Sequence, residues 1–179
     1  MSLDIDSWEA QDMLRNRIVG IVAVTVFFVA ASSVGAAPQS KGLITEKTIS
    51  TDMALTMAQA AIAKCRSENY HVSVHVIDAS GLDKVAMRDD GSGAVNFTVS
   101  KQKAFTALTY RRPSSVMEKA MANMSPARII PGIFAVGGGL PIIVDGQTIG
   151  AIGVGGAPGS DKDEACAAAG LAKVANLLK

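Results

Sequence analysis

The chain has 179 residues, of which 49% are hydrophobic and 18% charged, and its formal net charge is +1 at pH 7. This length suits one domain with a full hydrophobic core. The charge is close to neutral and no basic run or aromatic-interleaved basic patch occurs, which argues against a nucleic-acid-binding protein.

Residues 1–36 have the layout of a secretory signal peptide. Two arginines precede an apolar run, 18–31, that is shorter than the roughly 20 residues of a membrane-spanning helix. Small residues then lead to a cleavage site after Ala36. We therefore expect a signal peptide at 1–36, a mature domain at 37–179 and a periplasmic or secreted location. The alternatives are a translation start at Met13 and an uncleaved leader, which would hold the protein at a membrane.

In chain order, apolar spacing and turn residues predict a helix, two strands, two helices, a hairpin and a final helix. The expected ranges are a helix over 51–67, strands over 71–78 and 82–88, helices over 96–110 and 114–124, a short strand around 133–136, strands over 140–144 and 148–154, and a helix over 160–178. The pair Asp145-Gly146 favours a type I′ turn between the last two strands. Short turns between strands favour antiparallel pairing. The fold class is therefore α+β, a single compact domain with an antiparallel sheet of about five strands covered by helices.

The two histidines lie on the same face of the first predicted strand, opposite a face of three valines. His71 and His75 are four residues apart, so their Cα atoms are separated by about 13 Å and they cannot both bind one metal ion. Either one could still be the axial ligand of a porphyrin or corrinoid metal. The alternative is a half-buried or solvent-facing strand histidine.

The hairpin region, 137–158, is rich in glycine, including Gly138, Gly139 and Gly155. Strand glycines mark bulges or places where another backbone or a ligand comes close. The spacing alone favours fold geometry, and the functional alternative is a rim against which a flat ligand lies.

Other polar residues admit two interpretations each. Cys65 and Cys166 could form a disulfide in an exported protein, or could be two small buried hydrophobic residues. The acids Asp161, Asp163 and Glu164 resemble a metal cluster but are better explained by the start of a helix, where they offset the macrodipole.

A small-molecule enzyme acting on an acidic metabolite is the rival hypothesis from another class. Asp78, Lys101 or Glu118 could act as its general acid or base. Lys101 and Arg111 could equally hold ligand carboxylates such as heme propionates, and solvated helix faces are the alternative for both.

Four segments are similar, in this order, to a known family: VIDASG at 76–81, KQKAFTAL at 101–108, GGGLPIIVDGQTIGAIGVGG at 137–156 and DKDEACAAAGL at 161–171. They resemble the GlcG/HbpS-like heme-binding (heme-degrading) family, which includes the C-terminal domain of PduO-type proteins. The resemblance covers about residues 45–178. The family's usual strand-loop motif reads R-M-D-G-A, whereas residues 88–92 here read R-D-D-G-S.

The resemblance implies an exported heme-binding protein, active in heme sensing, scavenging or degradation, that assembles as a homo-oligomer from dimer to octamer. Cobalamin is the alternative cofactor, with a corrinoid-binding module as the corresponding function. We expect His75 as the first choice of iron ligand and His71 as the second. Lys101 and Arg111 would meet the propionates, and the glycine backbone of Gly138, Gly139 and Gly155 would lie near the ring.

Overall fold

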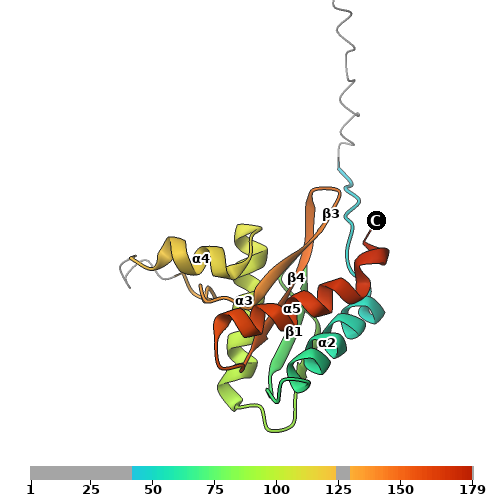
Figure 1. Ribbon diagram of the computed structural model, residues 1–179. Helices are drawn as coiled ribbons and strands as arrows, with labels where there is room; N and C mark the ends of the chain where they lie inside the picture. Colours follow the sequence, from blue (N-terminus) through green and yellow to red (C-terminus); the bar gives the residue numbers. More distant parts are fainter. Residues whose placement is uncertain (1–41, 124–129, 179) are drawn as a thin grey trace, which may run out of the picture. The chain divides into compact units, whose positions relative to one another are not determined.

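A computed structural model describes residues 42–123 and 130–178. Its elements follow the predicted order (Figure 1): α2 (Thr51–Arg66), β1 (Ser73–Asp78), β2 (Asp83–Arg88), α3 (Ala94–Tyr110), α4 (Ser114–Met121), β3 (Gly139–Val144), β4 (Gln147–Gly155), α5 (Ser160–Val174) and the short 3₁₀ helix η2 (Ala175–Leu177). Within these residues, four strands form one sheet that helices cover on both faces. The predicted α+β class is therefore confirmed.

The strands lie in the order β2-β1-β4-β3, and every neighbouring pair is antiparallel. The predicted hairpin joins β3 to β4, and φ is positive at both Asp145 (49°) and Gly146 (75°), as a type I′ turn requires. Residues 133–136 form no strand, although the sequence predicts a short one there. The Phe134 N–H donates instead to Oγ1 of Thr106, and the N–H groups of Ile133 and Val136 donate to backbone carbonyl oxygens two or three residues earlier.

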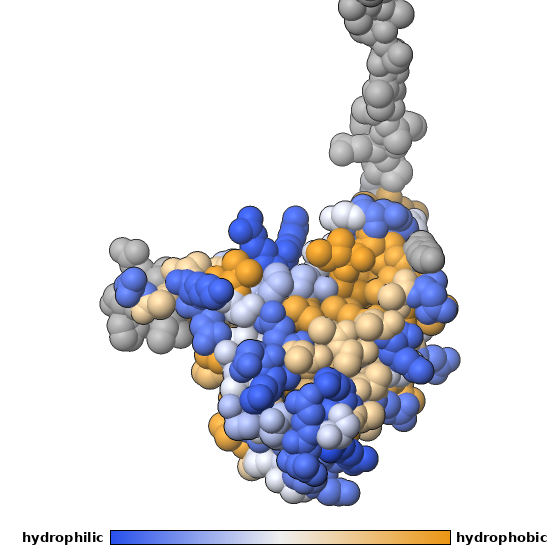
Figure 2. Space-filling view, viewed as in Figure 1, coloured by the Kyte–Doolittle hydropathy of each residue, from blue (hydrophilic) through white to orange (hydrophobic). Residues whose placement is uncertain are grey.

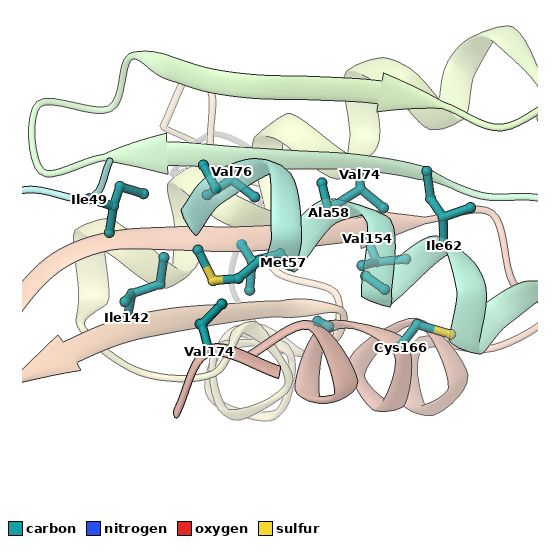
Figure 3. Close-up of a cluster of buried hydrophobic side chains, with 14 of the residues drawn as sticks. Ile49, Met57, Ala58, Ile62, Val74, Val76, Ile142, Val154, Cys166 and Val174 are labelled. Carbon is teal, nitrogen blue, oxygen red and sulfur yellow. The ribbon is translucent and has the colours of Figure 1, made fainter. Parts of the chain in front are cut away.

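The main core lies between one face of the sheet and the helices α2 and α5 (Figure 3). Val74 and Val76 of β1 point into it, as the strand alternation predicts. At the start of α2, the hydroxyl of Ser50 accepts a hydrogen bond from the backbone N–H of Met53, which caps the helix. A disulfide between Cys65 and Cys166 joins α2 to α5, so the paired alternative holds for the cysteines.

The helix α3 packs on the opposite face, over β1, β4 and β3, and leaves β2 largely uncovered. Gly139 and Gly153 are paired across β3 and β4 beneath this helix. A Cβ on Gly153 would lie 2.1 Å from the carbonyl oxygen of Ser100, and one on Gly139 would lie 2.1 Å from that of Lys103. The backbone of α3 therefore occupies the space of the missing side chains, which explains glycine inside these strands.

Thr45–Lys179 forms one compact unit. The predicted signal peptide at 1–36 and its cleavage site lie outside the described residues, as does the start of the predicted domain at 37. In the part of the chain that the structure describes, no helix is both long and apolar enough to cross a membrane.

Candidate functional site

His75 lies at the centre of β1 between the sheet and α3, and it is only 1% exposed. Its Nδ1 is 2.9 Å from Oγ of Ser100, and its ring meets Phe97 edge-on, with 4.4 Å between the ring centroids. Both partners belong to α3. Burial lowers the pKa of the imidazole below its usual range, so the ring is neutral at pH 7.

The Ser100 hydroxyl lies within hydrogen-bond distance of both His75 and the backbone of α3. The Ser100 hydroxyl donates its single hydrogen to the carbonyl oxygen of Phe97, 3.0 Å away. With the hydroxyl in this orientation, Nδ1 of His75 carries the ring hydrogen and donates it to Ser100 Oγ. Nε2 keeps a free lone pair and has no hydrogen-bond partner among residues 42–123 and 130–178. A neutral imidazole held at one nitrogen and free at the other is the form that binds a metal.

Beside His75 lies the part of the sheet formed by β2. On the face of the sheet that carries α3, this strand is not covered by the helix. Ala86 lies directly opposite His75 in the strand register, and Arg88 follows two residues later on the same face; both are exposed. Lys101 of α3 reaches across to Asp83 of β2, with 2.6 Å between Nζ and a carboxylate oxygen. We call this area the β2 face and define it by four residues: Ala86, Arg88, Phe97 and Lys101.

His71 lies two residues before the start of β1, away from the Ser100 and Phe97 surroundings of His75, and its side chain is 56% exposed. Its Nδ1 is 3.2 Å from Oδ2 of Asp89, a buried carboxylate that also accepts hydrogen bonds from Nε and Nη2 of Arg66. These Arg66 hydrogen bonds lower the pKa of Asp89, against the opposing effect of burial. Asp89 stands where the family motif has methionine, so this departure ties His71 to α2.

The sequence suggested that the backbone of Gly138, Gly139 and Gly155 could lie near a flat ligand. In the structure all three glycines are buried. A Cβ on Gly138 would lie 2.6 Å from the carbonyl oxygen of Val154, and one on Gly155 would lie 3.3 Å from that of Asn96. Together with Gly139 beneath α3, these glycines contact the sheet and its helices. Their surroundings agree with the fold-geometry alternative.

Lys103 and Asp163 form a buried ion pair that the sequence analysis did not anticipate. Nζ of Lys103 lies 2.7 Å from Oδ2 of Asp163, and each side chain is 4% exposed. Oδ1 of Asp163 also accepts a hydrogen bond from the backbone N–H of Ala157. Burial raises the pKa of the Asp163 carboxyl, while Lys103 opposes that shift. A sequence signal existed, because Lys103 adjoins Ala104 on the alanine-rich side of α3.

Each of the three predicted acid–base residues has a local partner. The carboxylate of Asp78 accepts two backbone N–H groups of the β1–β2 turn. Lys101 is paired with Asp83, and Glu118 of α4 accepts the backbone N–H of Gly137 at 2.9 Å.

A cavity of about 710 Å³ lies between α4 and α5, and a second of about 320 Å³ lies beside the C-terminal end of α3. Glu118, Asp161 and Glu164 line the first, and Arg111 lines the second. Neither cavity is lined by a histidine. The first would repel heme propionates, because its acids outnumber its single lysine.

Residues 49–172 match the family model described as "Haem degrading protein HbpS-like". GlcG of Escherichia coli strain K12 is 33% identical over 111 residues, which cover 62% of this chain and 83% of that protein. The crystal structure of HbpS is 34% identical with a TM-score of 0.71, covering 76% of this chain and 97% of that one. A PduOC:heme complex is 21% identical with a TM-score of 0.63, covering 71% of this chain and 95% of that one, and this likeness shows the fold alone.

Proposed function

The chain belongs to the HbpS-like family of heme-degrading proteins, and from this we propose that it binds heme and holds the iron through Nε2 of His75. Its fold is shared with PduOC, which has been solved as a heme complex. The single observation that carries the choice of residue is that Ser100 holds Nδ1 of His75 while the described hydrogen bonds leave Nε2 without a partner.

The residues around His75 suit a porphyrin. The exposed Ala86 and the 39% exposed ring of Phe97 offer apolar contact, and Arg88 and Lys101 offer cations for the propionates. His75 itself is 1% exposed, so binding requires neighbouring side chains, that of Phe97 among them, to turn away from the imidazole. The β2 face would then hold the ring, and Ser100 would keep the imidazole in its iron-binding tautomer.

When bound, heme would supply redox and oxygen chemistry that depends on its axial ligand and on the polarity around it. The chain's own contribution is to bind and orient. His75 would fix the distance of the iron from β1, Arg88 and Lys101 would fix the rotation of the ring about that axis, and Phe97 would exclude water from one side.

The test is a titration of the purified protein with hemin, followed at the Soret band. We expect a saturable shift that His75→Ala weakens at least tenfold. His71→Ala is the matched control, because it removes the other imidazole, and it should leave the titration unchanged. An unchanged spectrum of the wild type would contradict heme binding. If His71→Ala abolishes the shift and His75→Ala does not, the assignment to His75 is wrong.

A second titration arm separates heme from a corrinoid. Cobalamin added to the hemin-loaded protein should not reverse the Soret shift. Reversal at equimolar cobalamin would favour the corrinoid-binding alternative. Lys101→Ala should weaken hemin binding more than Arg111→Ala does, because Arg111 lines a separate cavity.

We propose that the protein is exported and works in the periplasm or outside the cell. Residues 1–36 have the layout of a signal peptide, and the Cys65–Cys166 disulfide is a bond that persists in oxidising compartments. N-terminal sequencing of the protein recovered from a periplasmic or culture fraction tests this. A mature chain beginning at Ala37 is expected, and an intact leader on protein found only in the cytoplasm would contradict export.

We also propose that the protein is a homo-oligomer. Figure 2 shows apolar surface around the β3–β4 hairpin and the end of α5. Exposed apolar side chains of this region include Ile143 of β3, at 47%, and Leu177 of η2, at 59%. Light scattering after size exclusion should give at least a dimer, and Ile143→Glu should reduce the mass. A monomeric wild type would refute the proposal.

A further inference from the structure

We propose that α4 and the chain that returns from it to β3 rest on an anionic membrane surface, with the apolar side of α4 in the lipid interface. We call this part the α4 arm and define it as residues 114–123 and 130–136. It is separate from the β2 face, and the proposal does not depend on heme. Figure 1 shows α4 extending outward from the body of the domain.

The two sides of α4 are placed in the opposite sense to those of a helix that covers a core. Its polar side, with residues at intervals of three and four, lines the cavity toward α5: Ser115, Glu118 and Lys119. Its apolar residues lie on the other side of the helix: Val116, Met117, Ala120 and Met121. A helix of a globular domain normally turns its apolar side to the core. Among the residues of α4, Ser114 alone is buried, so this chain does not use the apolar side of α4 for its core.

The apolar side chains of the α4 arm are accessible. Val116 is 41% exposed, and Ala120, one turn further along the same side, is exposed as well. On the return toward β3, Ile130 is 53% exposed and Phe134 is 36% exposed. Exposed apolar surface rimmed by polar residues marks a site that binds a protein or a membrane.

The base of the α4 arm is fixed to the start of β3. The Ser114 hydroxyl donates to the carbonyl oxygen of Val136 at 2.7 Å and accepts the backbone N–H of Gly139 at 2.8 Å. One turn later, Glu118 accepts the backbone N–H of Gly137. These bonds hold α4 in its outward position, so its apolar side is presented without any unfolding of the domain.

Charge selects the partner of the α4 arm. Arg111 and Arg112 directly precede the helix, both are exposed, and within the described part of the chain neither has an ion-pair partner. Glu118 is the one acid between residues 109 and 123, and it lies on the side toward α5. A second copy of the same apolar side would therefore bring no carboxylate to these arginines. An anionic lipid surface supplies both a partner for the cations and an apolar interior for Val116.

The experiment places an environment-sensitive fluorophore on the arm of the full chain through Val116→Cys. The two native cysteines are joined in a disulfide, so the new thiol is the one that reacts. We expect a saturable blue shift with vesicles of phosphatidylcholine mixed with phosphatidylglycerol, and none with phosphatidylcholine alone. The same label at Gln59→Cys, an exposed position of α2, should not shift. Because the label reports its own surroundings, membrane contact by residues 18–31 does not mimic the expected result.

Two changes in the labelled protein test the two parts of the interaction. Arg111→Asn with Arg112→Gln should weaken vesicle binding roughly thirtyfold, because each arginine near an anionic surface contributes a factor of about five. Asn is chosen because residue 111 has a φ of 54°, which Asn tolerates. Ala120→Asp puts a carboxylate on the apolar side and should abolish the shift. Lys162→Gln with Lys173→Gln removes the same charge from α5 and should leave binding unchanged.

Four results would overturn the proposal: no shift at position 116, an equal shift at position 59, an equal shift with phosphatidylcholine alone, or unchanged binding after loss of the two arginines. A blue shift that rises with protein concentration in the absence of vesicles would also overturn it, since a second copy would then cover the arm. Hemin titration of Ala120→Asp should match wild type, so a failure here and a failure of heme binding are distinguishable.

Discussion

Replacing Gly153 with alanine tests whether missing side chains set the distance between α3 and the sheet. The new Cβ would lie 2.1 Å from the carbonyl oxygen of Ser100 and 2.6 Å from the backbone nitrogen of Ala104. Ordinary van der Waals contact begins at 3.4 Å, so the helix must retreat by more than 1 Å at this point. Overpacking of a rigid backbone costs about 1–3 kcal/mol or more, and we expect about 3 kcal/mol here.

Gly155→Ala is the matched control on the same strand. Its Cβ would meet its nearest atom, the carbonyl oxygen of Asn96, at 3.3 Å. Neither Gly153 nor Gly155 has a positive φ, so backbone strain does not distinguish the two variants. We therefore expect Gly155→Ala to lower the free energy of unfolding by less than about 1 kcal/mol, the smaller end for a tight contact.

Urea denaturation followed by circular dichroism measures both variants. Gly153→Ala should also lower the melting temperature by roughly 10 °C, given a few degrees per kcal/mol in a domain of this size. The reasoning is refuted if Gly153→Ala is no less stable than Gly155→Ala. In that case α3 would be free to move, and the strand glycines would need another explanation.

Three further predictions concern the rest of the fold. Replacing Cys65 and Cys166 with alanine should lower the free energy of unfolding by about 4–5 kcal/mol, because the disulfide closes a loop of about 100 residues; equal urea midpoints for the oxidised and reduced protein would contradict this. Asp163→Asn should cost about 3–5 kcal/mol because Lys103 is then a buried charge without its partner; the double variant Lys103→Met, Asp163→Leu should recover much of the loss, and a cycle without coupling would refute the pairing. The lowered pKa of His75 means that the unfolded chain binds a proton first, so stability should be full above about pH 6.5 and decline as the pH falls below it; His75→Gln should flatten that part of the curve of urea midpoint against pH, and a wild-type curve already flat from pH 7 to 5 would contradict the assignment.

Local chemistry explains what the sequence predicted well. The alternation of Val74 and Val76 with His75 follows from the two-residue period of a strand, and it correctly separated the core face from the α3 face. The turn at Asp145-Gly146 followed from the tolerance of both residues for positive φ. These features depend on neighbours within a few positions, which a single sequence contains.

Contacts between distant segments account for what the sequence did not show. The pairing of β1 with β4 brings Gly153 beside His75, although 78 positions of the chain separate them, and no local pattern specifies it. Lys103 looked like one more helix lysine until α5 placed Asp163 within 2.7 Å of it. Glu164 looked like a capping acid, and only the folded chain shows that its Oε2 is buried without a hydrogen-bond partner.

The burial of His75 and its availability to a ligand follow from the same arrangement. On one side the imidazole is covered by α3, which approaches closely because Gly153 has no side chain, and this burial keeps the ring neutral at pH 7. On the other side α3 makes few contacts with β2, and Phe97, whose ring meets that of His75, is 39% exposed. Rotamers of partly exposed side chains change within nanoseconds and need no unfolding of the sheet. Burial keeps the imidazole neutral at pH 7, and the open side of the edge strand β2 is the side from which the proposed ligand would reach Nε2 once neighbouring side chains move.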